Sequence, residues 1–175
     1  TILADGKDVR KVGHKISDLV FEKLIGIRGA FSTHIAYVST INKNTADQKF
    51  ILQIADADGH NPRTIFTSKK YLMSPTWSPD GTRLAYVSFE SNNSAIYIQD
   101  IIQGTRSKIS AQAGINSAPA WSPDGRYLAL TLSISGSPNI YLMEIATRTI
   151  SRLTNASSID TEPCWMPDGK SLLFT

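Results

Sequence analysis

The amino-acid sequence predicts a mainly β protein: a partial β-propeller of about three four-stranded blades, preceded by the C-terminal helical end of an α/β domain. Three observations predict this fold. One motif occurs three times, its tryptophans Trp77, Trp121 and Trp165 stand 44 residues apart, and each period holds several short apolar segments separated by turn residues. A fixed period of about 40–50 residues with several strands is typical of propeller blades.

Each copy of the motif centres on a tight turn. In the first copy, residues 78–81 supply a proline that presets φ, an aspartate that can bond the backbone, and a glycine suited to positive φ. We therefore expect a hairpin in which Trp77 ends the first strand and requires burial. The next segment, residues 84–87, is apolar throughout, which favours a strand covered on both faces.

The chain opens with a short segment and a helical pattern. Residues 1–7 are expected to end a strand, with a turn at Asp5 and Gly6. The helical stripe that follows consists of Val9, Val12, Ile16, Leu19, Val20 and Leu24. Because one helical face cannot bury itself, we expect an earlier part of the same domain to cover it.

Local signals suggest how this helix is interrupted and ended. Gly13 is expected to break or bend it, Ser17 or Asp18 to cap its second piece, and Gly26 to end it.

Two glycines within residues 26–30 suggest a domain boundary. We therefore expect residues 1–29 to be the end of an N-terminal α/β domain with its linker. Residues 30–175 are then the first blades of a truncated propeller.

Short apolar segments between turn residues predict the strands of each blade. The first blade carries a longer loop at residues 42–47, since Tyr37 and its counterpart Tyr86 are 49 residues apart. The expected strands lie at residues 34–38, 50–55 and 63–66, then 84–88, 95–100 and 106–109, then 127–132, 139–145 and 150–153.

Composition excludes several classes of function. The net charge is +3 and the longest basic run is two residues, so nothing indicates a nucleic-acid partner. No apolar run approaches about 18 residues, so no membrane insertion is expected. Cys164 is the only cysteine, and it replaces Thr76 and Ala120 of the other repeats. We expect it to be a small buried filler.

The sequence offers little support for catalysis. It has neither a Gly-x-Ser-x-Gly elbow nor a Walker loop. The three histidines lack metal-ligand spacing, and the aspartates of residues 56–59 fit a turn better than a calcium loop. We therefore expect a non-enzymatic protein with no metal and no cofactor, and histidines that are surface or capping residues. These histidines are His14, His34 and His60.

The sequence gives more support to a binding surface than to catalysis. The innermost strand of each blade lines the central channel of a propeller, and the residues that enter these strands should gather at one mouth of that channel. A concave rim of this kind suits a peptide or a protein loop. Alternatively, these residues only shape the turn before each inner strand. The expected partner-binding residues are Met73, Ser74, Asn116, Ser117, Ala118, Thr161, Glu162 and Pro163.

Specific segments carry a family resemblance. Residues 17–31 (SDLVFEKLIGIRGAF), followed by IAYV at 35–38, closely resemble the junction between the two domains of the TolB family. Residues 72–81 and 84–91 resemble that family too, so that the likeness covers essentially the whole chain. The repeated Trp-Ser-Pro-Asp-Gly alone is less specific, since propellers of prolyl-oligopeptidase-like serine peptidases also carry it. A peptidase gate, or a propeller that binds a sugar or another small ligand, therefore remains an alternative.

The TolB resemblance implies a soluble periplasmic protein of Gram-negative bacteria with an N-terminal α/β domain and a six-bladed propeller. It implies membership of the Tol–Pal system, which supports outer-membrane integrity and cell division. The propeller mouth would bind the lipoprotein Pal, and colicin translocation segments could compete there. TolA would bind a far N-terminal segment that is absent from this chain. Ile115 departs from the family pattern, because better-known relatives carry a Pal-contacting histidine at this position.

Overall fold

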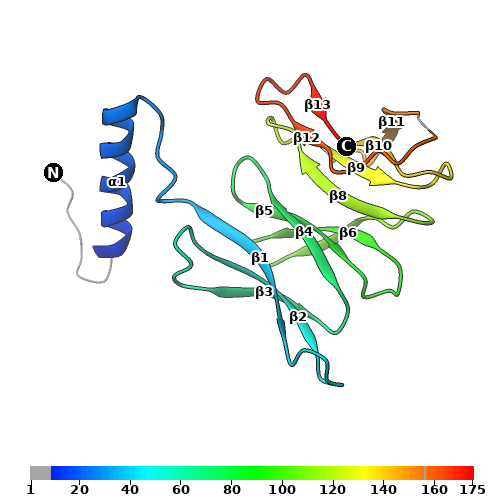
Figure 1. Cartoon of the computed structure of the whole chain (residues 1–175), viewed down its shortest axis with the longest axis horizontal. Coiled ribbons are helices and arrows are strands. Elements are labelled where there is room, and N and C mark those ends of the chain that lie inside the picture. The colour runs from blue at the N-terminus through cyan, green and yellow to red at the C-terminus, as the bar shows by residue number, and fades with distance from the viewer. Residues whose placement is uncertain (1–8, 156) are drawn as a thin grey trace. The chain divides into compact units, whose positions relative to one another are not determined.

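The computed structural model describes residues 9–155 and 157–175 (Figure 1). The strand and turn expected at residues 1–7 lie outside the described residues. The domain boundary expected between residues 29 and 30 stays a prediction. The chain divides into two compact units, of which the first comprises Thr1–Tyr37 and Gln53–Thr64 and the second Val38–Leu52 and Ile65–Thr175.

Within the described residues, one helix precedes thirteen strands. The strands form four sheets, ordered β1-β2-β3, β4-β5-β6-β7, β8-β9-β10-β11 and β12-β13. The elements are α1 (Val9–Ile25), β1 (His34–Ile41), β2 (Lys49–Asp56), β3 (Arg63–Ser68), β4 (Leu72–Trp77), β5 (Arg83–Ser88), β6 (Ala95–Asp100), β7 (Arg106–Ser110), β8 (Asn116–Trp121), β9 (Tyr127–Leu132), β10 (Asn139–Glu144), β11 (Ile150–Arg152), β12 (Cys164–Trp165) and β13 (Leu172–Leu173).

Helix α1 is continuous, so the expected break at Gly13 is wrong. A single glycine costs a helix only about 1 kcal/mol relative to alanine. The N-terminal cap expected at Ser17 or Asp18 is also wrong, because both residues lie inside the helix. Gly26 ends the helix as expected, with a φ of 74° and a bond from its N–H to the carbonyl of Glu22 (2.8 Å).

Asp18 holds the chain that follows the helix. Its carboxylate accepts hydrogen bonds from the backbone N–H groups of Phe31 (2.7 Å) and Ser32 (3.0 Å). Hydrogen bonds from the Ser32 side chain and from these two N–H groups lower the pKa of Asp18. A Cβ on Gly29 would lie 2.7 Å from the Cα of Asp18, so this close approach requires glycine.

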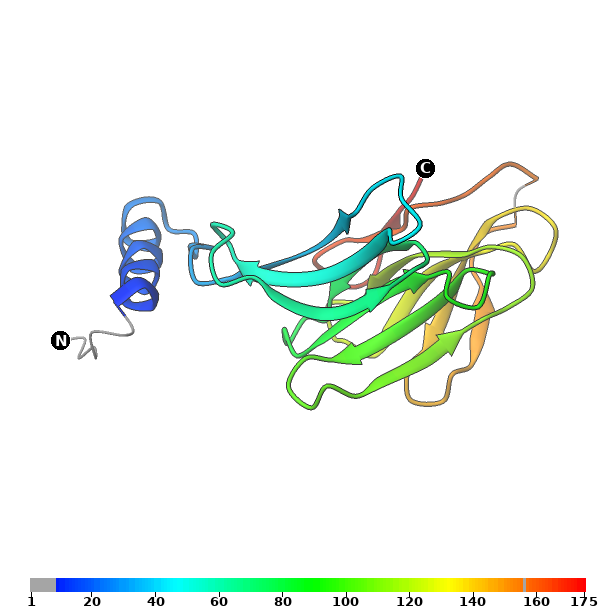
Figure 2. The ribbon, with the colours of Figure 1, turned by 90° about the horizontal axis from the view of Figure 1, so that it is seen from below.

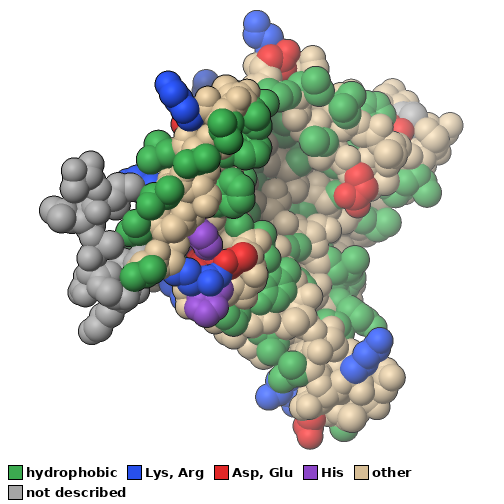
Figure 3. Space-filling view, turned by 60° about the vertical axis from the view of Figure 1, so that its left-hand side comes forward, with side chains coloured by type: hydrophobic (Ala, Val, Ile, Leu, Met, Phe, Trp, Pro, Cys, Tyr) green, Lys and Arg blue, Asp and Glu red, His purple; other side chains and the backbone are tan. Residues whose placement is uncertain are grey.

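The apolar stripe of α1 is not covered by any described part of the chain, since the helix has no buried residue. Leu24 is 76% exposed and Val9 is 64% exposed. Figure 3 shows these hydrophobic side chains along the helix. The expectation that an earlier part of a domain covers this stripe stays a prediction.

The second unit shows the blade repeat. Its two complete blades, β4–β7 and β8–β11, are antiparallel four-stranded sheets joined in chain order. Figure 2 shows these two sheets from below, in green and in yellow to orange. The described parts of the neighbouring blades hold three strands (β1–β3) and two (β12–β13). The partial-propeller fold is therefore confirmed, with two rather than three blades of four strands.

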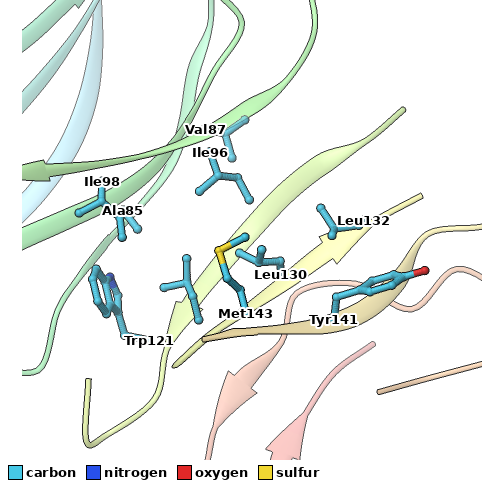
Figure 4. Close-up of a cluster of buried hydrophobic side chains, with 10 residues drawn as sticks. Ala85, Val87, Ile96, Ile98, Trp121, Leu130, Leu132, Tyr141 and Met143 are labelled. Carbon is cyan, nitrogen blue, oxygen red and sulfur yellow. The ribbon is translucent and has the colours of Figure 1, made fainter. Parts of the chain in front are cut away.

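The main hydrophobic core lies between the two complete blades. Side chains of β5 and β6 meet those of β8, β9 and β10 in one layer (Figure 4). Residues 84–88 of β5 are all buried, which confirms the expectation of a strand covered on both faces. The core residues are Ala85, Val87, Ile96, Ile98, Trp121, Leu128, Leu130, Leu132, Tyr141 and Met143.

The turn of the repeated motif forms as expected. The Ser78 hydroxyl donates to Asp80 (2.5 Å) and accepts from the N–H of Arg83 (2.9 Å), while Asp80 accepts from the N–H of Thr82 (3.0 Å). The Ser78 hydroxyl and then the Thr82 N–H lower the pKa of Asp80 to about 2. Residues 122–127 repeat this pattern at nearly identical distances.

The tryptophans of the second and third motifs also join neighbouring blades. The indole N–H of Trp121 donates to the carbonyl of Thr76 (3.3 Å), and that of Trp165 donates to the carbonyl of Ala120 (3.1 Å). Both acceptors precede the tryptophan of the previous blade. The indole nitrogen of Trp77 is buried and has no hydrogen-bond partner among the residues that the structure describes.

Cys164 is exposed, so its expected role as a buried filler is wrong. Its counterparts Thr76 and Ala120 are only half-buried, so the position itself is not a core position. The β12–β13 sheet has two strands in the described structure, so little packs over the cysteine.

Candidate protein-binding site

The inner strands of the two complete blades begin with the same irregularity. Met73 pairs with Val87, but the next pair is Thr76 with Ala85, so that two residues of β4 oppose one of β5. This arrangement is a β-bulge. The β8–β9 pair has the same shift between Ser117 and Ala120.

The third copy reproduces the bulge. Thr161 and Thr175 exchange two backbone hydrogen bonds (2.8 and 3.0 Å), while Cys164 pairs with Leu173. Two residues, Glu162 and Pro163, again oppose a single residue of the neighbouring segment.

The first bulge residue of every copy has a left-handed backbone. The φ angles are 50° at Ser74, 47° at Ala118 and 53° at Glu162, and a proline follows each. Glycine is the usual occupant of this conformation, which costs other residues about 1–2 kcal/mol. Strained backbone that recurs at equivalent positions is a mark of functional sites.

The structure places the eight predicted site residues on these three bulged segments and divides them by exposure. Met73 is 50% exposed, and Ser74 and Glu162 are exposed. Ser117 and Thr161 are half-buried. These five can contact a partner, and we call them the rim residues. The remaining three, which are Asn116, Ala118 and Pro163, are buried.

Asn116 is fully buried and its side chain is engaged within its own loop. Its Oδ1 accepts from the Ser110 hydroxyl (2.7 Å) and from the N–H of Gln112 (2.9 Å). Its Nδ2 donates to the carbonyls of Gln112 (2.7 Å) and Gly114 (3.3 Å). Asn116 therefore fixes the loop that leads into β8, and its side chain does not face solvent.

The prediction of the site missed two exposed apolar side chains beside the rim residues. Tyr71 is 60% exposed and Ile159 is 66% exposed, and Ile115, noted above only as a departure from the family, is 44% exposed. The three stand 44 residues apart and each lies two places before a rim residue. The 44-residue period that places the rim residues also places these three side chains, so the sequence does carry a signal for them.

All three histidines belong to the first unit, whereas the rim residues belong to the second. In the first unit, Nε2 of His14 lies 3.1 Å from Asp58, which also pairs with Arg10. Figure 3 shows histidine side chains beside acidic and basic ones there. A cavity of about 370 Å³ adjoins this cluster, lined by Phe21, Phe31 and Arg28 among others.

The described residues give no sign of a metal centre or a membrane span. In the described parts of the chain, no group of three or more His, Cys, Asp or Glu side chains could hold a metal ion. None of the helices described is long and apolar enough to cross a bilayer. Residues 56–59 form the expected turn, in which the N–H of Gly59 donates to the carbonyl of Asp56 (2.8 Å).

Comparisons with known proteins agree with the propeller fold described above. The family model described as the TolB beta propeller domain matches residues 21–175. The Tol-Pal system protein TolB of Thioalkalivibrio sulfidiphilus is 57% identical over 117 residues, which are 67% of this chain and 27% of that protein. The crystal structure of TolB from Acinetobacter baumannii matches with a TM-score of 0.90 at 44% identity, over 99% of this chain and 43% of the solved chain.

The likeness to peptidases is more distant. A puromycin-hydrolyzing peptidase of Mycobacterium tuberculosis has 19% identity and a TM-score of 0.60, over 77% of this chain and 22% of that one. At this identity it shows the fold alone. The chain spans about a quarter of the length of the curated relatives it matches. Since the family model matches most of its residues, the chain belongs to the TolB β-propeller family.

Proposed function

We propose that this chain is part of a periplasmic Tol–Pal protein that binds the peptidoglycan-associated lipoprotein Pal at the mouth of its propeller channel. The curated relatives carry the name of the Tol-Pal system, which supports the choice of partner. The whole protein would thereby support outer-membrane integrity and cell division. TolA would bind a segment outside this chain, and colicin translocation segments would compete with Pal at the mouth.

The observation that carries the proposal is the repeated left-handed residue at the start of the inner strands. The same bulge at Ser74, Ala118 and Glu162 gives consecutive blades a fixed, similar edge at the mouth. Such a preformed edge suits recognition of a folded partner, because little conformational freedom is lost on binding. Recognition by shape and hydrogen bonds needs no catalytic group.

The peptidase-gate alternative gains no specific support. Its structural relatives share only the fold with this chain, and the named close relatives are Tol-Pal proteins. A non-enzymatic role is therefore preferred.

Calorimetric titration of the globular domain of Pal into the full-length protein tests this function. A Met73→Ala, Glu162→Gln double variant changes two exposed rim residues. We expect it to bind Pal about tenfold or more weakly, because central interface side chains carry most of the binding energy. Asn116 is unsuitable as a target, since its replacement would disturb the loop itself.

The matched control is an Ile102→Ala, Glu22→Gln double variant, which changes an exposed apolar residue and an exposed acid elsewhere. It should bind Pal as the unmodified protein does. Equal binding by both double variants would move the site away from the mouth. Absence of binding at Pal concentrations approaching ~1 mM would refute the proposed function.

A further inference from the structure

A second cavity, of about 200 Å³, is lined by residues of both complete blades. Its apolar lining consists of Ile98, Ile109 and Ile145, which belong to the main core or pack against it. Figure 4 shows Ile98 at one end of that core. Two arginines, Arg83 and Arg148, also line the cavity. The cavity therefore combines an apolar floor with positive charge.

Neither arginine belongs to the blade repeat. One period of 44 residues after Arg83 stands Tyr127, and one period before Arg148 stands Gly104. The turns around residues 104 and 148 are otherwise alike, because the N–H of each residue donates to the carbonyl four positions earlier (3.0 and 2.8 Å). A blade therefore forms without either guanidinium group, and the two charges need another explanation.

The backbone of Arg148 is strained. Its φ is 59°, close to the 71° of Gly104, and glycine adopts this left-handed conformation far more readily than arginine does. The side chain extends to the neighbouring blade, where Nη1 donates to the carbonyl of Lys108 in β7 (3.4 Å). A strained residue that brings a charge to a cavity indicates a function beyond the fold.

The positive charges of the cavity lack carboxylate partners. Within the described parts of the chain, neither cavity arginine forms an ion pair, and Arg83 lies over the ring of Trp121 (4.8 Å to its centroid). The third charged group of the lining is Asp100, whose Oδ1 accepts from the backbone N–H groups of residues 102 and 103 (2.8 and 2.7 Å). Two guanidinium groups and one carboxylate leave one positive charge in excess, which suits a monoanion.

We propose that this cavity binds a small organic carboxylate. Guanidinium groups bind a carboxylate through paired, charge-assisted hydrogen bonds, and the hydroxyls of Thr105 and Ser107 in the lining can donate further ones. The apolar part of the ligand would rest on the three isoleucines, while Oδ2 of Asp100 could accept from an amide N–H. The volume is below that of sites for drug-sized ligands, so the ligand is small.

This site is separate from the rim residues. Leu84, next to Arg83, pairs with Trp77, whereas Val87 pairs with Met73 at the other end of β4. The inference therefore goes beyond the proposed function and does not depend on it.

Titration of the full-length protein with N-acetyl-leucine tests the proposal. This compound carries a carboxylate, an amide N–H and an apolar side chain, and we expect a dissociation constant of about 1 mM. The NMR signal of the Trp121 indole N–H, assigned by its loss in Trp121→Phe, should shift on binding because Arg83 lies over that ring. The neutral amide of the same compound should leave the signal unchanged.

The informative variant is Arg148→Gly, which restores the residue found at the equivalent Gly104. It should weaken binding about tenfold or more, because a charge-assisted hydrogen bond is lost, and its midpoint of urea unfolding should stay equal or rise. The control is Arg152→Gln, at an exposed arginine of β11 outside the lining. It should bind as the unmodified protein does.

Several results would overturn the proposal. They are absence of a shift up to about 20 mM ligand, equal binding of the acid and its amide, or unchanged binding by Arg148→Gly. Tighter binding of inorganic phosphate would show that the cavity selects a different anion. A lower unfolding midpoint of Arg148→Gly, with no ligand bound by the unmodified protein, would mean that Arg148 only joins the blades. Pal binding by Arg148→Gly should be unchanged, so the two proposals can fail separately.

Discussion

The two ends of a blade are built differently. At the end that carries the Trp motif, the turn satisfies its own polar groups: the hydroxyl of Ser78 and the carboxylate of Asp80 both bond within the turn. At the other end, where the bulges lie, the repeats keep the backbone shape and change the side chains, with Ser74, Ala118 and Glu162 in one conformation. The contrast teaches that the turn repeats both its backbone and its side chains, whereas the first bulge position repeats only its backbone and leaves its side chain free to differ.

The largest expected effect tests whether the buried loop that leads into β8 stabilises the fold. Asn116→Ala removes four side-chain hydrogen bonds inside a fully buried loop. We expect it to lower the free energy of unfolding by about 3 kcal/mol, because the backbone groups of Gln112 and Gly114 lose their partner. Urea unfolding measures this change. The control is Ser117→Ala at the adjacent half-buried position, with a loss below about 0.5 kcal/mol. Equal effects at both positions would contradict the assigned role of Asn116.

A smaller effect is expected for the pH dependence of stability, through the turn of the Trp motif. The pKa of Asp80 is about 2 in the folded protein, below its ordinary value of 3.8. A lowered pKa stabilises the fold above pH 4, and this stabilisation is lost as the pH falls from about 4 to 2. Asp80→Asn should therefore cost about 1 kcal/mol at pH 7, after allowance for solvent screening, and should flatten the acid limb of the stability profile.

Chemical unfolding at a series of pH values measures that profile. The control is Asp47→Asn in the exposed loop after β1. It should reproduce the unmodified curve. An acid limb that remains steep in Asp80→Asn would show that other carboxylates control acid unfolding.

The smallest expected effect addresses backbone strain at the first bulge. Ser74 has a φ of 50°, which glycine adopts without penalty. Ser74→Gly should raise the free energy of unfolding by about 0.5 kcal/mol, since relief of strain exceeds the extra entropy of glycine in the unfolded chain. The control Ser107→Gly, within strand β7, should lower it by about 0.5–1 kcal/mol. The opposite signs, measured by urea unfolding, distinguish strain from a general effect of glycine; destabilisation by both would contradict strain at Ser74.

Local chemistry explains which parts of the fold could be predicted. The hairpins follow from the proline, aspartate and glycine of residues 78–81, whose conformations depend on their immediate neighbours. The end of α1 at Gly26 was predicted for the same reason. The expected break at Gly13 was wrong because a single glycine costs a helix only about 1 kcal/mol, which is too little to interrupt α1.

The site was harder to predict, because exposure depends on tertiary packing. The period of 44 residues gave the location of the inner-strand segments, but a polar type suggested that Asn116 faces solvent, whereas it is buried. The left-handed bulge left no signal in the sequence, since serine, alanine and glutamate occupy a position where glycine would have revealed it. Binding at these residues stays a prediction.

The bonds between indoles and carbonyls have a consequence for how unfolding can be observed. Trp121 bonds to a carbonyl of the blade before it, and Trp165 does the same one blade later. Each indole N–H therefore reports on the integrity of its predecessor through its rate of exchange with deuterated solvent. Trp121 and Trp165 are therefore two natural probes, with which the loss of the two blades before them can be timed in a single experiment without any label being introduced.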